Sequence, residues 1–357
     1  MTDVTVQERL KWPPETLERV SACPVCRSTS RTRLHDNLVD NMYSAPGTWD
    51  MQQCTDCGSA YLDPRPTPDS IAGAYAEYLT HGPAATSEPQ GLKAAFGRVR
   101  RRLSNAYIGS LARGKGVAVA LPETLGAVLV KALVPWREVL DARYRHLRRP
   151  ESGADRLLDV GSGNGDFLLR AQRLGWKAEG VDFDPKAVAA AQARGVKAQV
   201  GSIDSYAHVR DAFDVVTCSH VIEHVYEPRH LLAAMHRILK PGGRLWIETP
   251  NIRSVGHAVF GRNWRGLEAP RHLIIFSHHS LARMVEEARF TITQRSSWNI
   301  EAIRFVFAAS EASASGADSP NARTSPLPNG RLLRALWLEA LFADRQEFVT
   351  LRATKPS

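Results

Sequence analysis

Two short cysteine pairs are the first features of the sequence that could do chemistry. Cys23 and Cys26 form one Cys-x-x-Cys pair, and Cys54 and Cys57 form the other. Each pair can supply two thiolates to one metal ion, and together they complete a tetrahedral zinc site. Because four thiolates leave no open coordination position, such a zinc ion would hold the fold together and take no part in catalysis. Four unligated buried cysteines are the alternative.

A glycine-rich stretch, DVGSGNGDF at residues 159–167, is the strongest chemical signal further along the chain. Glycines between a buried strand and a helix allow a tight turn and a close approach of the backbone to a ligand. A dinucleotide-binding fingerprint would need glycine at position 166, and the lysine of a nucleotide-phosphate loop is missing as well. An ordinary glycine-rich turn of another doubly wound fold is the alternative.

Four ordered motifs resemble those of the class I S-adenosylmethionine-dependent methyltransferases. They are the glycine-rich stretch and then GVDFD at 180–184, FDVV at 213–216 and LKPGG at 239–243. The resemblance covers residues 156 to about 300. It implies a Rossmann-like fold and S-adenosylmethionine as the cofactor.

The same resemblance implies the cofactor contacts. Asp182 ends the second expected strand, where its carboxylate would accept hydrogen bonds from both ribose hydroxyls. Asp159, Gly161 and Gly163 would surround the methionine end of the cofactor. Ser202 and Ile203 lie where the adenine is held, although the family often has Asp at the first of these positions. The full set expected around the cofactor is Asp159, Gly161, Ser162, Gly163, Gly165, Asp182, Phe183, Ser202, Ile203, Ser219 and His220.

The segment HVIEH at residues 220–224 carries the candidate base. It follows the fourth expected strand, at the carboxyl edge of the sheet where ligands bind. At helical spacing His220, Glu223 and His224 share one face. We expect His224 to remove a proton from a hydroxyl acceptor, with Glu223 orienting or assisting it; a purely structural Glu-His pair is the alternative. A catalytic divalent ion is a further alternative, but quinone-type O-methyltransferases have Glu where this chain has His220.

Two more segments are expected on the acceptor side. Residues 54–78 resemble the N-terminal zinc module of methyltransferases that modify sugars, glycans and secondary metabolites. In those proteins the module packs over the acceptor, so Tyr75 and Tyr78 would line the substrate pocket unless they are core aromatics. A loop that begins WRGLEAPRHL at residue 264 resembles a loop of the same group. There Arg271 and His272 would grip an anionic or hydroxyl-rich acceptor, unless the loop is only solvated.

Strand-like and helix-like segments alternate from Arg156 onward, which predicts a parallel sheet with crossover helices. The expected strands are 157–160, 178–183, 197–200, 213–218, 244–248, 290–293 and 347–352, and the clearest helices are 228–239 and 277–288. The expected fold class is a doubly wound, mostly parallel seven-stranded α/β sheet with a small N-terminal zinc-binding module. The expected domains are a zinc-ribbon-like module at 1–90, a basic helical connecting segment at 91–150 and the methyltransferase domain at 151–357, with a mobile loop near 310–330.

The net charge of +9 is concentrated in one stretch of the chain. Between Lys93 and Arg149, thirteen basic residues and three acidic ones give a local charge of +10. A basic amphipathic segment can lie on an anionic membrane or bind a phosphate-bearing acceptor such as a lipid-linked glycan. A solvated helix pair or a homodimer surface is the alternative. The N-terminus has no signal-peptide core, and the apolar stretch 117–134 is interrupted by charges and Pro122, so we expect a cytoplasmic protein, with peripheral contact at the inner face of the membrane.

These features favour methyl transfer from S-adenosylmethionine to a sugar, glycan or sugar-derived metabolite by in-line displacement with His/Glu base assistance. An RNA methyltransferase is the first alternative. Nucleic acid is not the expected partner, because the positive charge avoids the cysteine pairs and the Asn/Asp-Pro-Pro-Tyr signature for base amines is absent. The second alternative is a non-catalytic cofactor-binding protein, since the glycines and Asp182 predict binding rather than turnover.

Overall fold

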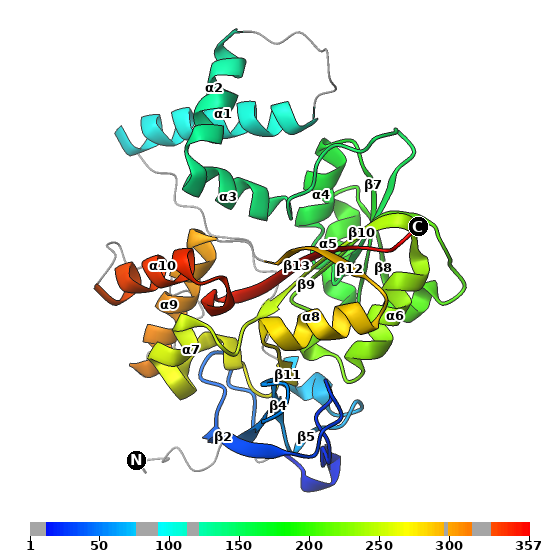
Figure 1. Cartoon of the computed structure of the whole chain (residues 1–357), viewed down its shortest axis with the longest axis vertical. Helices are drawn as coiled ribbons and strands as arrows, with labels where there is room; N and C mark the ends of the chain where they lie inside the picture. Colours follow the sequence, from blue (N-terminus) through cyan, green and yellow to red (C-terminus); the bar gives the residue numbers. More distant parts are fainter. Residues whose placement is uncertain (1–11, 76–91, 113–120, 296–298, 316–329) are drawn as a thin grey trace. The chain divides into compact units, whose positions relative to one another are not determined.

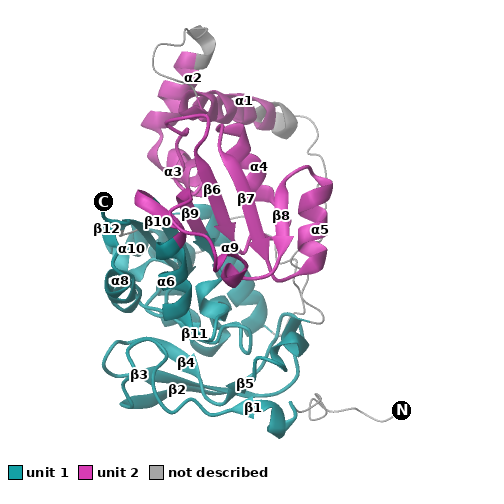
Figure 2. Ribbon diagram, turned by 90° about the vertical axis from the view of Figure 1, so that its right-hand side faces the viewer, with its two compact units in different colours: residues 1–78, 218–237, 244–357 teal, residues 79–217, 238–243 magenta. Residues whose placement is uncertain are grey.

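The computed structural model describes residues 12–75, 92–112, 121–295, 299–315 and 330–357. The chain forms two compact units (Figure 2). Unit 1 comprises Met1–Tyr78, Cys218–Arg237 and Arg244–Ser357, and unit 2 comprises Leu79–Thr217 and Ile238–Gly243. Each unit is therefore assembled from segments that are far apart in the sequence.

One sheet of the described chain has seven strands, in the order β12-β13-β10-β9-β6-β7-β8. Their bounds are β6 Arg156–Val160, β7 Lys177–Asp182, β8 Lys197–Val200, β9 Phe213–Ser219, β10 Leu239–Pro250, β12 Thr291–Arg295 and β13 Phe348–Thr354. The strands β6, β7 and β8 pair in parallel, whereas β13 pairs antiparallel with both β10 and β12. This is the predicted doubly wound, mostly parallel seven-stranded sheet.

Crossover helices connect the parallel strands of unit 2 (Figure 1). They are α4 (Asp166–Arg173) and α5 (Pro185–Ala193). Asp184 accepts the backbone N–H of Lys186 and so caps α5, and Pro185 occupies its first turn, as the sequence predicts. Apolar side chains of both helices pack with strand residues in one buried cluster that includes Phe167, Leu168 and Val188.

The basic stretch of unit 2 contains three helices: α1 (Leu92–Ala112), α2 (Leu121–Ala132) and α3 (Val134–Arg143). Tyr107 of α1, Val130 of α2 and Leu140 of α3 form a small apolar cluster. The hydroxyl of Tyr107 donates a 2.8 Å hydrogen bond to Asp141. The three helices therefore have a core of their own.

Unit 1 contains a second sheet with the order β11-β4-β3-β2. Its strands are β2 Arg31–Leu38, β3 Trp49–Cys54, β4 Ala60–Leu62 and β11 Ile274–Ile275, and a separate ribbon pairs β1 Leu17–Glu18 with β5 Arg65–Pro66. Ile274 pairs with Tyr61, so a strand that follows β10 in the chain completes the N-terminal sheet. The remaining α-helices of unit 1 are α6 Pro228–Ile238, α7 Val255–Phe260, α8 His278–Glu287, α9 Ile300–Ala314 and α10 Gly330–Leu341.

Several expected boundaries are wrong in detail. The strand β10 begins at Leu239 and runs through the Pro241–Gly243 turn signal, whereas the sequence predicts a strand only from Arg244. The beginning of the expected mobile loop, residues 310–314, is the last turn of α9, and residues 316–329 lie outside the described residues. The segment Ile222–His224 is a short 3-10 helix, η5, rather than part of a regular α-helix.

Candidate functional site

The glycine-rich bend between β6 and α4 adopts backbone angles that favour glycine. Gly161, Gly163 and Gly165 have φ values of 74°, 52° and 79°, in the left-handed region where a side chain would strain the backbone. Packing adds a second constraint, because a Cβ added to Gly165 would lie 2.6 Å from Cγ2 of Val196. The three glycines therefore present bare backbone at the carboxyl edge of β6, where ligands bind in doubly wound sheets.

Asp182 ends β7 and lies beside this bend. Its Oδ2 accepts the N–H of Gly163 at 2.8 Å, and its Oδ1 accepts the N–H of Asp184 at 3.0 Å. These bonds fix the carboxylate while leaving each oxygen a further acceptor position. The geometry suits the role that the resemblance implies, in which the carboxylate holds a pair of hydroxyls.

Arg145 is a residue that sequence reasoning missed at this site. Its guanidinium pairs with Oδ1 of the fully buried Asp159, donates to Oγ1 of Thr217 at 2.9 Å and lies 3.9 Å from the ring centre of Phe167. Burial raises the pKa of Asp159, and the charge of Arg145 partly offsets this. Because only the folded chain brings these partners to it, Arg145 was indistinguishable from the other arginines of the basic stretch.

The bend and its neighbours in unit 2 fit S-adenosylmethionine. Among the described residues, Oγ of Ser162 and Oδ2 of Asp159 are buried without a hydrogen-bond partner, which leaves polar groups for a ligand to satisfy. Phe183 is 64% exposed directly after Asp182 and offers an aromatic face. Ser202 caps the 3-10 helix η4 (Ile203–Tyr206) through the N–H of Asp204, and Ile203 is buried. Ser219 and His220, the last two expected cofactor contacts, belong to unit 1.

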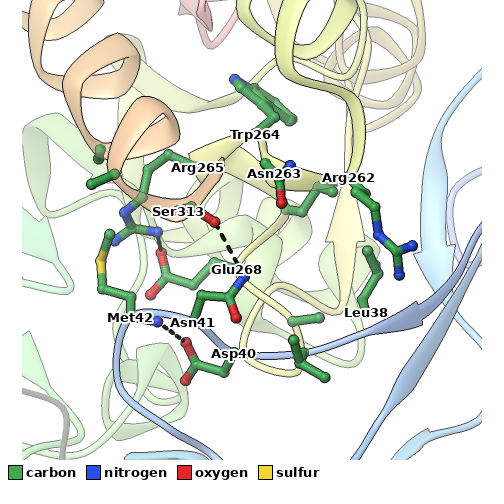
Figure 3. Close-up of a pocket in the computed structure, with 15 residues that line it drawn as sticks. Leu38, Asp40, Asn41, Met42, Arg262, Asn263, Trp264, Arg265, Glu268 and Ser313 are labelled. Atoms are coloured by element: carbon green, nitrogen blue, oxygen red, sulfur yellow. Dashed lines mark hydrogen bonds and ion pairs between the residues drawn. The ribbon is translucent and has the colours of Figure 1, made fainter. Parts of the chain in front are cut away.

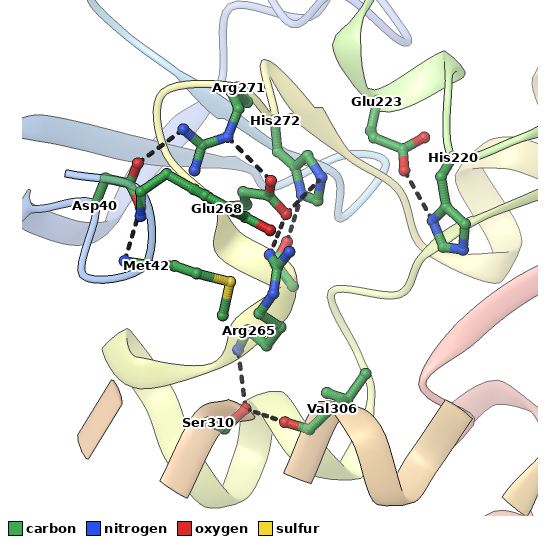
Figure 4. A network of polar contacts seen from close by, with 12 residues as sticks. Asp40, Met42, His220, Glu223, Arg265, Glu268, Arg271, His272, Val306 and Ser310 are labelled. Carbon is green, nitrogen blue, oxygen red and sulfur yellow. Dashed lines mark hydrogen bonds and ion pairs between the residues drawn. The ribbon is translucent and has the colours of Figure 1, made fainter. Parts of the chain in front are cut away.

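His220 opens the segment that follows β9. Its φ is 53°, and its backbone N–H donates to Glu248 O at 2.9 Å. The Nδ1–H donates to Oε1 of Glu223 at 3.1 Å, as Figure 4 shows, and Nε2 lies 3.7 Å from Oε1 of Glu248. The side chain is 40% exposed. Glu223 thus holds the ring of His220 at Nδ1, and the ring is accessible to solvent.

Glu223 is fully buried and orients His220. Its second oxygen accepts the Thr249 hydroxyl at 2.9 Å. Burial raises the pKa of Glu223, but the hydrogen bond from His220 and the positive charge that this ring can carry lower it to about 2. We expected Glu223 to orient His224. Its hydrogen bond goes to His220 instead, and the backbone at His220 is left-handed rather than helical.

His224 lies against the N-terminal module. Its Nδ1 is 3.0 Å from Arg271 O and 3.2 Å from the hydroxyl of Tyr75, the last residue of the 3-10 helix η3 (Ile71–Tyr75). Burial raises the pKa of the Tyr75 phenol, which therefore stays protonated. The structure thus brings together Tyr75 and His224, two of the expected acceptor-side residues. Tyr78 lies outside the described residues.

Glu223, His224 and His272 have ligand-capable atoms within 4.8 Å of one another. Both oxygens of Glu223 already have partners in His220 and Thr249. The Nδ1–H of His272 donates to Gly266 O at 2.8 Å, and burial lowers the pKa of His272 to about 4, so the ring is neutral. A divalent cation at this cluster would have to share the Glu223 carboxylate with His220 and Thr249.

Arg271 is the centre of a buried ion-pair network (Figure 4). It has no exposed surface; its Nη1 donates to Asp40 at 2.7 Å and its Nε to Glu268 at 3.0 Å. Glu268 also pairs with Arg265, whose backbone N–H donates to Ser310. In this structure the guanidinium joins the loop to the N-terminal module through Asp40, and protein covers every side of it. The expected contact of Arg271 and His272 with an acceptor stays a prediction.

A small cavity borders this network in unit 1 (Figure 3). Its volume is about 50 Å³, and Asp40, Arg265 and Glu268 form part of its polar lining. Sites for drug-sized ligands are about 300–1,000 Å³. The cavity therefore holds at most small polar groups or water, and we do not assign the acceptor to it.

The two cysteine pairs meet in unit 1 in matching turns. Sγ of Cys23 lies 3.7 Å from Sγ of Cys57, and Sγ of Cys26 lies 3.5 Å from Sγ of Cys54. Zn–S bonds of about 2.3 Å in a tetrahedron place sulfur atoms about 3.8 Å apart. In each pair the residue after the second cysteine has positive φ and donates its N–H to the carbonyl of the first cysteine. The four thiols thus fit a single zinc ion.

Comparisons with known proteins agree with the motifs. A family described as "Methyltransferase domain" matches residues 133–295. The ubiquinone biosynthesis O-methyltransferase of Thiobacillus denitrificans is 31% identical over 169 residues, which cover 43% of this chain and 72% of the relative. The enzyme of the same name from Xanthomonas oryzae pv. oryzae is 37% identical over 123 residues, which cover 32% of this chain. The chain spans about half the length of that relative (51%).

Two solved structures are also similar. Geranyl diphosphate methyltransferase in complex with SAM matches with a TM-score of 0.43 and 16% identity, over 70% of this chain and 95% of that one. An S-adenosylmethionine-dependent methyltransferase from Mesorhizobium loti matches with a TM-score of 0.40 and 20% identity, over 61% of this chain and 97% of that one.

Proposed function

Because this chain belongs to the class I S-adenosylmethionine-dependent methyltransferases, we propose that it methylates a hydroxyl oxygen and that His220 accepts the hydroxyl proton. The observation that carries the proposal is the buried, ionised Glu223 hydrogen-bonded to Nδ1 of His220. That bond keeps the proton on Nδ1 and leaves the lone pair of Nε2 for a substrate proton. The carboxylate of Glu248, 3.7 Å from Nε2, favours the imidazolium that results.

The remaining residues bind and align. The bound cofactor supplies a methyl group already activated on a sulfonium, so the protein has mainly to orient the reactants and remove one proton. Asp182 and the glycine bend hold the nucleoside and methionine parts of the cofactor. Glu223 and Thr249 fix the ring of His220. Base assistance of this kind contributes about 10²–10⁴-fold in rate.

The acceptor that we propose first is a sugar, glycan or sugar-derived metabolite. Its support is the resemblance of the cysteine-containing module and the loop beginning at Trp264 to methyltransferases of such acceptors. Within unit 1 these two segments share a sheet through the pairing of Ile274 with Tyr61, and Tyr75 of the module lies within hydrogen-bonding distance of His224. The module therefore borders the segment that holds the candidate base.

The second candidate acceptor is a ring hydroxyl of a quinone precursor. Its support is the name of the relatives that are 31% and 37% identical, ubiquinone biosynthesis O-methyltransferase. Both candidates present a hydroxyl, so the same base chemistry serves either.

An incorporation assay with methyl-labelled S-adenosylmethionine tests the function. Three acceptor pools are offered separately: sugar nucleotides with lipid-linked glycans, polyprenylated catechols, and total RNA. We expect label in the first pool, in base-stable ether form. Label only in the catechol pool supports the second candidate. Label only in RNA, or in none of the pools with the cofactor bound, contradicts the proposal of a small hydroxyl acceptor.

We further propose that Cys23, Cys26, Cys54 and Cys57 hold a structural zinc ion, on the strength of their sulfur separations and paired turns. Because all four coordination positions are thiolates, the ion has no site for substrate. Metal analysis of the purified protein tests this: we expect one zinc per chain, and a metal-free protein with full stability would contradict it.

A further inference from the structure

Within the described part of the chain, the helix α2 has an exposed apolar face. Leu125, Val128 and Leu129 of α2, and Leu133 directly after it, recur at helical spacing, and their exposed fractions run from 45% to 73%. Lys131 is the one charged side chain between residues 124 and 136. Large exposed apolar patches are uncommon on soluble proteins and mark interaction sites. We therefore expect this apolar face to bind a partner.

The opposite face of α2 explains why these side chains point outward. Ala127 and Val130 are buried, and a Cβ added to Gly126 would lie 3.2 Å from both Ala106 and Leu103 of α1. The contact with α1 thus fixes the rotation of α2. Rotating the apolar stripe inward would break this packing, so the exposure is a property of the hairpin.

Positive charge accompanies the apolar face on the adjoining helix. Arg98, Arg100, Arg101 and Arg102 of α1 are all exposed. After α3, Arg145 pairs with the buried Asp159, and the exposed Arg148 pairs with Asp141. Further exposed basic side chains of the stretch lie apart from one another on α2 and at or after the end of α3 (Lys131, Arg143, Arg148 and Arg149). The densest exposed arginine cluster of the described residues is therefore the one on α1, which packs against α2.

We propose that the α1–α2 hairpin docks on an anionic lipid bilayer, with the apolar stripe of α2 in the headgroup region and the arginines of α1 on anionic headgroups. Amphipathic helices bind membranes through this combination of apolar burial and charge attraction. A second copy of this chain is the less suitable occupant, because a twofold interface on α2 would bring two clusters of four arginines together. Among the described helices none is long and apolar enough to cross a bilayer, so the contact is peripheral.

Docking of the α1–α2 hairpin on a bilayer does not depend on which acceptor the enzyme methylates. It places the enzyme at a membrane surface, whichever hydroxyl it methylates. A bilayer contact carried by unit 2 and a base carried by unit 1 are separate properties, so either can fail in experiment without the other.

Vesicle flotation tests the proposal. The full-length protein is mixed with vesicles of phosphatidylcholine alone or with one quarter phosphatidylglycerol, at low and high salt. We expect flotation with the anionic vesicles at low salt, with at least a tenfold smaller bound fraction at high salt because ions screen the arginines. Absence of the protein from the anionic vesicle fraction would overturn the proposal.

Three variants assign the binding to the hairpin. Leu125→Ser with Val128→Ser and Leu129→Ser removes the stripe at exposed positions, and we expect at least a tenfold loss of binding to anionic vesicles. Arg98→Gln with Arg101→Gln should lower binding several-fold and reduce its salt dependence. The matched control, Leu333→Ser with Trp337→Ser, alters a similarly exposed apolar face on α10 and should float like the parent protein. Equal loss in the control, or no loss in the stripe variant, overturns the assignment to α2.

Two further measurements test whether the variants remain folded and whether α2 is a dimer surface. Affinity for S-adenosylhomocysteine should be unchanged in all variants, which shows that unit 2 remains folded. Light scattering reports the oligomeric state. A parent dimer that the stripe variant converts to monomers, without vesicle binding by either, would show that α2 is a dimer surface and would refute the membrane proposal.

Discussion

The Nδ1 atom of His220 lies 3.1 Å from Oε1 of Glu223, whose other oxygen accepts the hydroxyl of Thr249 at 2.9 Å. This pair combines a solvent-accessible imidazole with a carboxylate that is buried and ionised. His224, the other histidine of the segment, uses its Nδ1 on a main-chain carbonyl instead. The geometry therefore favours His220 as the candidate base. It also predicts different effects for substitutions at Glu223 and at Thr249.

Replacing the orienting carboxylate should lower turnover. In Glu223→Gln an amide NH₂ can face Nδ1, which favours the tautomer with its proton on Nε2 and removes the lone pair needed by the substrate. We expect kcat to fall about 100-fold, within the range of general-base effects. Thr249→Val, which removes only the hydrogen bond behind Glu223, should cost about tenfold or less. Equal kcat in Glu223→Gln and the parent enzyme would contradict the orienting role.

Asp182 should control donor affinity. Hydrogen bonds to a charged group contribute about 1.5–3 kcal/mol each, and tenfold in affinity is about 1.4 kcal/mol. Asp182→Ala should therefore weaken S-adenosylhomocysteine binding by at least about tenfold in calorimetry. Asp182→Asn keeps one acceptor oxygen and should weaken it less. Thermal unfolding controls for the loss of the Gly163 and Asp184 contacts. Unchanged affinity in a folded Asp182→Ala protein would reject the ribose assignment.

The cysteine cluster should behave as one metal site. Cys54→Ser removes one of four thiolates, so we expect loss of bound zinc and a lower temperature of unfolding. The control is Cys218→Ala, a buried cysteine on β9 that is not part of the cluster; it should retain one zinc per chain. Retention of stoichiometric zinc by Cys54→Ser together with Cys57→Ser would exclude the proposed ligand set.

A buried carboxyl pair predicts how stability depends on pH. Glu347 accepts the N–H of Gly256 and the indole N–H of Trp264, while Oε1 of Glu339 has no hydrogen-bond partner in the described chain. Burial raises the pKa of both groups, and for Glu339 the negative charge of Glu347 raises it further. The folded protein therefore keeps protons that the unfolded chain loses above pH 4.5, so the free energy of unfolding falls as pH rises.

Glu339→Gln tests this relationship, because it removes the ionisation and keeps the shape. One unit of pKa shift corresponds to about 1.4 kcal/mol. We expect the variant to gain several degrees in melting temperature at pH 9 relative to the parent protein and little at pH 5. A difference that is the same at both pH values would mean that the pair does not titrate as described.

Local signals predicted much of the fold. The cap formed by Asp184 and Pro185 and the strand Lys197–Val200 depend on neighbours in sequence and were correctly predicted. The alternation of strand-like and helix-like segments, together with the order of the four motifs, predicted the seven-stranded sheet. The first two motifs lie at the ends of β6 and β7, and the last two lie at the starts of β9 and β10. Strand β11 was missed, since two residues contain no periodicity and their partner Tyr61 is more than 200 positions away.

The candidate site was predictable in composition but not in pairing. The segment at 220–224 was identified, yet a helical arrangement was assumed where His220 has positive φ and only a 3-10 turn follows. Arg145 and Glu339 could not be found, because their partners Asp159 and Glu347 are brought to them by tertiary packing. Tertiary packing decides which of these buried groups lie beside one another, and one sequence does not contain that information.

The most direct test of the account compares the methyl-transfer rates of His220→Ala and His224→Ala at saturating donor, with the acceptor identified by the incorporation assay. We predict that His220→Ala lowers kcat by about 10²–10⁴-fold while S-adenosylhomocysteine affinity changes only a few-fold, and that His224→Ala loses less than tenfold in kcat. Near-normal turnover in His220→Ala, with the large loss in His224→Ala, would contradict the central claim.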